Sequence, residues 1–142
     1  MATIVKISSS EINNALEGTT RQYLVGNLQK PERLQHIPNS LIEIGITRYG
    51  EHGGREATHT HKQAFEFQYV TSGITAYLDT TTREEHVFTA GDFYMIEHGV
   101  VYAQKSGPNT EILFIKVPPG NDKVSVDITP EVQTWFERPI AE

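Results

Sequence analysis

The chain has 142 residues, 37% of them hydrophobic, and a formal net charge of −6, which fits one folded domain and not a disordered chain. Its 12 Lys and Arg residues are scattered and outnumbered by 18 Asp and Glu, which excludes nucleic-acid binding, and no stretch has the ~20 apolar residues of a membrane span. The lack of cysteine excludes thiolate metal sites, thiol catalysis and disulfides. Residues 1–10 contain no apolar run typical of signal peptides, so we expect a cytoplasmic protein.

Residues 1–40 are expected to form an N-terminal arm that packs on the rest of the domain. Ser8 stands three residues before Glu11, which is the spacing of a capping box, and apolar residues follow at helical intervals. This pattern predicts a short helix over residues 9–17, ended by Gly18. A strand is predicted over residues 21–28, before Pro31 and Pro38 break the segment.

Residues 41–117 have the pattern of an all-β sandwich or barrel. Short runs of strand-forming residues are separated by turn residues at spacings of about 8 to 12. Between Phe65 and Val70 the side chains alternate, so that Glu66 and Gln68 share one face of the strand. The predicted strands are residues 41–49, 57–61, 65–71, 74–80, 84–88, 93–97, 100–105 and 111–117.

Residues 118–142 are expected to form a C-terminal tail in which the strands stop. Thr129-Pro130-Glu131 has the residue types of a helix N-cap and the first two helical positions. The helix that follows would present Trp135 and Phe136 to an apolar surface. The arm, the barrel and the tail together are expected to form one domain.

His59 and His61 are the first candidates for a metal site. If their segment is extended, both imidazoles emerge from the same face, and Glu66 follows on the next strand. Two neutral imidazoles and a carboxylate suit Fe(II), Mn(II), Ni(II) or Zn(II), with positions left for water or substrate. Taken alone, the pair also fits two histidines that face solvent from an exposed strand.

The residues around this pair have a definite spacing. The segment reads Gly53, five residues, His59, one residue, His61, four residues, Glu66, six residues and Gly73. It resembles the first conserved motif of the cupin superfamily at every fixed position. The resemblance implies a double-stranded β-helix, also called a jelly-roll barrel, that holds one divalent metal ion through His59, His61 and Glu66.

The second cupin motif is matched in its glycines but not in its polar positions. Gly91 opens the motif, and Gly99 falls where the family has its turn glycine. The resemblance implies a third metal-binding histidine three residues later, but that position is Tyr102. Tyr102 can therefore be a phenolate ligand, a hydrogen-bond partner of a metal-bound water, a catalytic proton donor in a metal-free site, or a side chain that fills the barrel.

The resemblance implies two classes of function. The first is a metal-dependent enzyme of isomerase, epimerase, lyase or oxygenase type that acts on a small polar, sugar-like substrate, with Tyr102 as the catalytic acid or base. The second is a binding or sensing module without turnover. A metal-free sugar or nucleotide-sugar isomerase that uses Tyr102 is a third alternative, because the family includes epimerases that use a tyrosine as acid without a metal.

Three further residues are candidates for the substrate pocket. Gln68 shares a strand face with Glu66, Gln104 shares one with Tyr102, and His52 lies in the Gly-rich loop before the metal motif. Each of them also fits a solvated position at a strand end or in a loop. We further expect a homodimer, because such barrels cover their edge strands by association, and residues 21–28 and 135–136 are the candidate surface.

Overall fold

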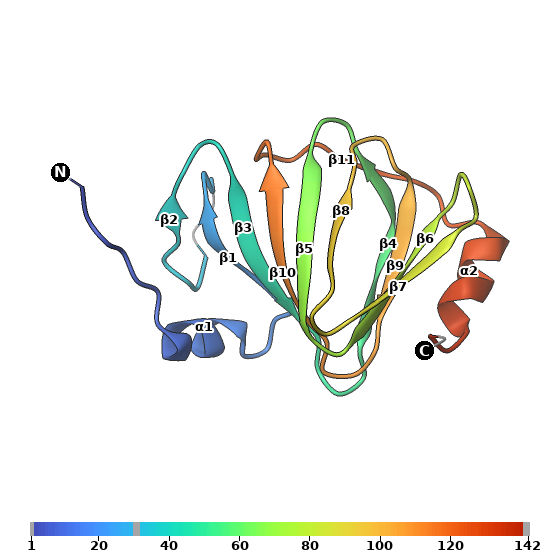
Figure 1. Ribbon diagram of the computed structural model, residues 1–142, viewed down its shortest axis with the longest axis horizontal. Coiled ribbons are helices and arrows are strands. Elements are labelled where there is room, and N and C mark those ends of the chain that lie inside the picture. The colour runs from blue at the N-terminus through green and yellow to red at the C-terminus, as the bar shows by residue number, and fades with distance from the viewer. Residues whose placement is uncertain (1, 30–31, 141–142) are drawn as a thin grey trace.

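Two β-sheets face each other and enclose the interior of the protein (Figure 1). The computed structural model describes residues 2–29 and 32–140. The six-stranded sheet has the spatial order β2 (Ile37–Pro38), β1 (Arg21–Gly26), β3 (Glu43–Arg48), β10 (Glu111–Val117), β5 (Phe65–Ser72) and β8 (Phe93–Ile96). The five-stranded sheet has the order β11 (Lys123–Ser125), β4 (Gly54–His61), β9 (Tyr102–Ser106), β6 (Ile74–Asp79) and β7 (Glu85–Thr89).

Alternation along β5 determines which side chains reach the interior. Gln68 and Val70 are buried, whereas Tyr69 between them is exposed. The face that carries Glu66 and Gln68 is therefore the inner one. In the register of the six-stranded sheet, Glu66 pairs with Lys116 of β10. The interior of this barrel is consequently polar around Glu66.

Apolar packing is divided between the interior and the outer face of the five-stranded sheet. The interior cluster consists of Val70, Tyr77, Tyr94, Tyr102 and Ile112. The outer cluster consists of Ala76, Leu78, Ala103, Val132 and Trp135. Because Val132 and Trp135 belong to the C-terminal helix, that helix covers the outside of the five-stranded sheet.

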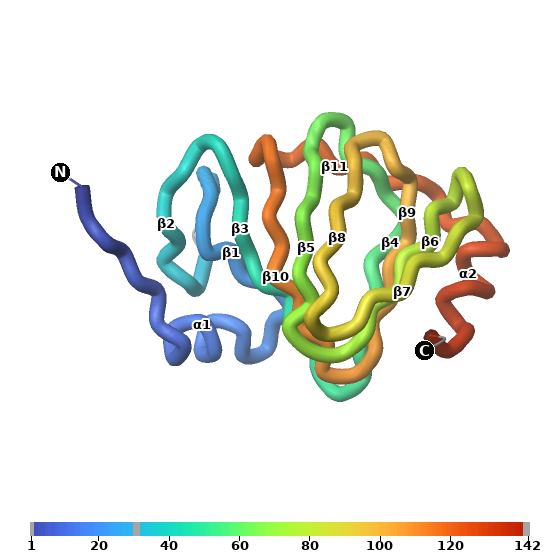
Figure 2. Tube along the Cα trace, viewed as in Figure 1, coloured from blue at the N-terminus to red at the C-terminus, as the bar shows by residue number. Residues whose placement is uncertain are grey.

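Both predicted helices form, and they lie at opposite ends of the molecule (Figure 2). Helix α1 (Ser9–Leu16) begins with the predicted capping box between Ser8 and Glu11. Helix α2 (Pro130–Glu137) begins at the N-cap Thr129, whose hydroxyl accepts from the amide of Val132 at 3.2 Å. Lys105 of β9 lies beneath α2, and its Nζ is 2.7 Å from the carbonyl oxygen of Arg138.

The tail differs from its prediction. Residues 123–125 form β11 and pair with β4, with Lys123 opposite His61, so the expectation that strands stop after residue 117 is wrong. The strand predicted over residues 21–28 is β1, which ends at Gly26 and lies inside the six-stranded sheet between β2 and β3. Within the described residues, neither helix has the length and apolar character needed to cross a membrane.

Candidate functional site

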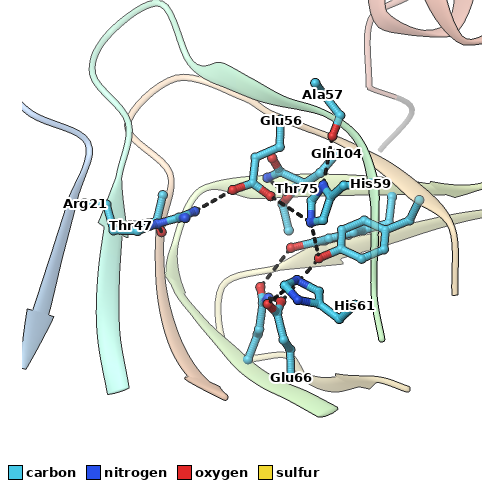
Figure 3. Close-up of polar contacts among 12 residues, drawn as sticks. Arg21, Thr47, Glu56, Ala57, His59, His61, Glu66, Thr75 and Gln104 are labelled. Atoms are coloured by element: carbon cyan, nitrogen blue, oxygen red, sulfur yellow. Dashed lines mark hydrogen bonds and ion pairs between the residues drawn. The ribbon is translucent and has the colours of Figure 1, made fainter. Parts of the chain in front are cut away.

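His59, His61 and Glu66 approach one another from β4 and β5 (Figure 3). The two histidines are two residues apart on β4, so they share its inner face, and a short turn then leads into β5. Tyr102 is the direct cross-strand partner of His59 in the pairing of β4 with β9. Directly opposite residues in an antiparallel pair bring their side chains close together, which explains the contact between these two.

A β-bulge in β4 gives this strand its inward-facing side chains. The register pairs Glu56 with Gln104 and His59 with Tyr102, so β4 has one residue more than β9 in this interval. Glu56 and His59 therefore both face the interior, although residues three apart would lie on opposite faces of a regular strand. Ala57 lies within the bulge, and its carbonyl oxygen is 2.8 Å from Nδ1 of His59.

His59 is held as a neutral imidazole of one tautomer. The carbonyl of Ala57 only accepts hydrogen bonds, which assigns the hydrogen to Nδ1 of His59 and leaves Nε2 as an acceptor. The hydroxyl of Tyr102 lies 3.0 Å from Nε2 and donates to it. His59 is only 2% exposed, and its burial lowers its pKa.

His61 favours the charged state. Its Nε2 is 3.0 Å from Oε1 of Glu66, and its Nδ1 is 2.8 Å from Oδ1 of Asp122. Burial alone would lower the pKa of His61, but the hydrogen bonds to Glu66 and Asp122 outweigh burial and raise the pKa. Burial alone would raise the pKa of each carboxyl group, but hydrogen bonds that include those from His61 hold both pKa values below the usual range.

Tyr102 is a neutral phenol in the middle of this cluster. It is 3% exposed, and burial, reinforced by the charges of Glu66 and Glu56, raises its pKa well above the usual value. Its oxygen lies 3.0 Å from Nε2 of His59 and 3.3 Å from Oε2 of Glu66. One phenolic proton therefore faces two acceptors, and the shorter contact is the one with His59.

Sequence reasoning did not find several residues of the site, among them Asp122, Arg21 and its partner Glu56. Asp122 comes from the C-terminal tail, and besides His61 it binds the backbone amides of residues 63 and 64 at 2.9 and 2.8 Å. Arg21 comes from the N-terminal arm, and its Nη2 lies 2.5 Å from Oε1 of Glu56. No local pattern in the sequence could have revealed β11, which has only three residues, or the position of Asp122 before it.

The three proposed pocket residues have different positions. Gln68 is buried, and its Nε2 donates to Oε2 of Glu66 at 2.8 Å. Gln104 is also buried, and its Nε2 donates to Oγ1 of Thr75 at 2.8 Å. The side chain of His52 is exposed and borders a different cavity. The structure thus brings Gln68 into the cluster, places Gln104 in a separate buried hydrogen-bond group with Thr75 and leaves His52 outside.

A cavity of about 220 Å³, called the polar cavity below, opens beside the cluster. His59, His61 and Glu66 line it, whereas Tyr102 lies behind His59. Its other charged lining residues are Arg21, Glu43, Glu56, Lys116 and Lys123. Because both signs of charge are present, the polar cavity fits a small polar molecule with hydroxyl or carbonyl groups.

The donor atoms are suited in kind to a divalent metal ion. Nδ1 of each histidine is tied to an oxygen atom, which leaves the Nε2 atoms for ligation, as is usual for metal-bound histidines. Among residues 2–29 and 32–140, however, no three His, Asp or Glu side chains stand at ligand spacing around one point. In this structure the Nε2 atoms are instead hydrogen-bonded to Tyr102 and Glu66.

No protein-family model and no curated protein matches the chain, but solved structures do. KdgF from Halomonas sp. is similar with a TM-score of 0.54 and 15% identity over 72% of this chain and 80% of KdgF. A double-stranded β-helix protein from Klebsiella pneumoniae is similar with a TM-score of 0.52 and 22% identity over 63% of this chain and 78% of that one.

Pac13 from Streptomyces, described as a nucleoside dehydratase, is similar with a TM-score of 0.54 and 17% identity over 66% of this chain and 74% of Pac13. Structures of Pac13 variants with a replaced tyrosine or histidine contain uridine. At these identities the likeness shows a shared fold. The chain therefore has the double-stranded β-helix fold of cupins, which confirms the predicted all-β class.

Proposed function

We propose that the protein is a small-molecule enzyme of lyase or isomerase type that moves protons between its histidines and a polar, sugar-like substrate in the polar cavity. The observation that supports this proposal is that one wall of the polar cavity holds a neutral histidine and a histidine that favours the charged state. His59 is a neutral acceptor at Nε2, and His61, whose ring centre is 5.2 Å away, favours the imidazolium. A proton acceptor beside a proton donor is the basic requirement for acid–base catalysis, which contributes about 10²- to 10⁴-fold in rate.

In the lyase form, Nε2 of His59, which lines the polar cavity, accepts a proton from a substrate carbon. The hydroxyl of Tyr102, which donates to the same nitrogen, turns to Oε2 of Glu66, 3.3 Å away, and so frees Nε2. His61 gives its Nε2 proton to a departing hydroxyl group. One C–H and one C–O bond break, a C=C bond forms, and water leaves, after which exchange with solvent restores both histidines. In the isomerase form, the abstracted proton returns to a different carbon.

The likeness to Pac13 supports this choice of reaction and substrate. Pac13 is described as a nucleoside dehydratase, and a dehydratase removes water by the kind of elimination outlined above. A nucleoside also contains a sugar, as expected for the substrate here. Pac13 and this chain share a fold, and the proposed chemistry rests on the residues of this chain.

A second candidate is a metal-dependent reaction. The contacts of Nδ1 in His59 and His61 with the carbonyl of Ala57 and the carboxylate of Asp122 favour it, because such contacts orient metal-bound imidazoles. His59, His61 and Glu66 would hold one Fe, Mn, Ni or Zn ion, which would supply a Lewis acid or activate water. Tyr102 would then be the remaining proton donor or acceptor in the cluster.

Deuterium exchange tests the proposal directly. The untagged protein is incubated in D₂O with a panel of nucleosides, aldehyde sugars and keto sugars, and NMR follows loss of the C–H signal and release of product. We expect exchange for at least one compound, and its loss in His59→Gln, which keeps a polar side chain. Compounds that bind without any exchange would indicate a binding module and contradict the proposal.

Elemental analysis separates the two candidates. Protein purified without a tag or chelator is analysed for first-row metals, and exchange is repeated after dialysis against EDTA. Metal-independent exchange supports proton transfer by the side chains alone. About one metal ion per chain, lost together with exchange, supports the metal-dependent reaction instead.

A further inference from the structure

A second cavity, of about 270 Å³, lies against the other side of Tyr102. It opens between β7 and β8, which are the end strands of the two sheets. We call it the aromatic cavity because three Tyr and one Phe line it. Its principal lining residues are Tyr77, Phe88, Tyr94, Ile96, Val100 and Tyr102, and the proposed proton transfer leaves its space unused.

The tyrosines present ring carbon to the aromatic cavity because their hydroxyl groups are engaged elsewhere. The hydroxyls of Tyr77 and Tyr94 donate to Oε1 of Gln68 at 2.8 and 2.7 Å. The hydroxyl of Tyr102 is occupied by His59 at 3.0 Å. The resulting wall is apolar, and a ligand gains by burying carbon against it.

Three of the rings in this wall pack against one another. The rings of Phe88 and Tyr94 are stacked at 3.9 Å with an interplanar angle of 6°. Tyr77 meets both of these rings edge-on, at 5.9 and 5.2 Å between centroids. A planar ring can continue this arrangement by offset stacking or edge-to-face contact, which adds to the gain from burial.

The charges that border the aromatic cavity are acidic. Asp79 and Glu97 contribute carboxylates, His86 adds an imidazole, and no Lys or Arg is among the described residues that line it. The polar cavity, by contrast, has Arg21 and two lysines in its wall. An anion would therefore be repelled from the aromatic cavity, whereas N–H and O–H donors on a ring would find acceptors.

We infer that the aromatic cavity is a binding site for an uncharged planar ring of the size of indole or a nucleobase. Its volume supports this class of ligand, because an apolar cavity of about 150 Å³ already accommodates benzene. The inference is independent of the proton-transfer chemistry, since it depends on the walls of a separate cavity. A bound ring would lie against Tyr102 on the face away from the polar cavity.

Titration of the full ¹⁵N-labelled chain with indole tests the inference. We expect saturable amide shifts in β7, β8 and Val100, and none of this kind with benzoate, which has a similar planar ring but a negative charge. Val100→Trp should fill the cavity and weaken indole binding by at least about tenfold, since the buried ring area is lost. The spectrum of β1 and β3, which lie away from the cavity, shows whether that variant is folded.

Glu97→Lys provides a second variant at an exposed position that has little influence on folding. It should leave indole binding within a few-fold of the wild type and introduce binding of benzoate to the same amides. Absence of saturable indole shifts, shifts confined to residues that do not line the aromatic cavity, or equal indole affinity in folded Val100→Trp would each overturn the inference. Failure of Glu97→Lys to bind benzoate would overturn the electrostatic part of it.

Discussion

One phenolic proton connects Tyr102 to His59, and the surrounding side chains keep both groups neutral. Burial raises the pKa of the phenol and lowers that of the imidazole, so ionisation is unfavourable for each. Glu66 lies 3.3 Å from the same phenolic oxygen and provides a second acceptor. The oxygen of Tyr102 therefore bridges His59 and Glu66.

Tyr102→Phe removes this oxygen and keeps the ring. We expect proton exchange into the substrate to fall by about 100-fold or more, as is typical when a group that takes part in acid–base catalysis is lost, because Tyr102 controls the acceptor atom of His59. The free energy of unfolding should change by only about 1–2 kcal/mol, because one hydrogen bond is lost. Exchange rates from NMR and urea unfolding measure the two effects.

Tyr94→Phe is the matched control. It removes a buried hydroxyl that binds Gln68 and does not contact His59. Exchange should stay within a few-fold of the wild type. Equal activity of the Tyr102 and Tyr94 variants would contradict a catalytic role for Tyr102 and identify it as part of the barrel packing.

The contact of His61 with Asp122 predicts a pH-dependent stability. The pKa of His61 is raised on folding, so its contribution is fully present below its unfolded pKa and is lost as pH rises through the folded value. The pKa of Asp122 is lowered, so its contribution is present above its unfolded pKa and is lost only in stronger acid. Both contributions are present together between about pH 4.5 and 6.5, given ordinary Asp and His values.

Asp122→Asn tests this contact. Urea unfolding of the wild type and the variant at pH 5.5 and pH 8.5 gives the loss of stability at each pH. We expect a larger loss at pH 5.5, where His61 is charged, than at pH 8.5. The same loss at both values, or a larger one at pH 8.5, would show that the charge of His61 does not contribute through Asp122.

At the scale of elements, α2 acts as the cover of the five-stranded sheet. Trp135 is 1% exposed and donates from its indole N–H to Glu85, while Nζ of Lys105 lies 4.3 Å from the centre of its ring. Lys105 also binds two carbonyl groups at the end of the helix. The helix is thus fixed by apolar burial and by a cation near its C-terminus, where the helix dipole favours positive charge.

Trp135→Ala should lower the free energy of unfolding by about 3–5 kcal/mol, as is common when a buried aromatic side chain is truncated. Phe136→Ala is the control, because Phe136 is only partly buried in the same cluster, and its effect should be clearly smaller. Urea unfolding followed by far-UV circular dichroism measures both. Comparable small effects would mean that α2 contributes little to the stability of the sheet beneath it.

The elements that could be predicted are those with a strong local pattern. Alternation revealed β5, and the glycine and histidine spacing located β4 and the turn before Glu66. Strand β11 has three residues and β2 has two, which is too short for alternation to show. Asp122 was missed because its place beside His61 depends on pairing between segments about sixty residues apart and on no local motif.

In the molecule as a whole, the outer face of the six-stranded sheet leaves apolar side chains exposed, whereas α2 covers the outer face of the five-stranded sheet. Phe93 is 62% exposed and Met95 44%, and Phe93 stacks with Phe67 of the neighbouring strand. Tyr69 is exposed beside them. Contiguous exposed apolar residues of this kind mark an interaction surface. Trp135, which was expected at the interface, is instead buried within its own chain.

We therefore expect a homodimer in which two copies pack these faces together. A two-fold contact uses the same patch on both copies, and the outward side chains of β5 and β8 at its centre are uncharged. Light scattering should give twice the chain mass of 16.0 kDa, and Phe93→Glu should give monomers by placing like charges opposite each other. Val126→Glu, at an exposed position directly after β11, is the control. A wild-type monomer at high micromolar concentration would contradict this expectation.

The extra residue in the β4 bulge determines which face of the strand carries the two histidines. Ala57 and Thr58 stand opposite the single residue Ala103, so the inward and outward alternation of side chains shifts by one residue between Glu56 and His59. A deletion of one residue here would restore simple alternation and turn either Glu56 or both histidines to the outside. Length changes in the exposed turn at residues 50–52 leave this count intact. We therefore expect chains that keep this site to vary in length at the turn and to keep the number of residues between Glu56 and His59 fixed.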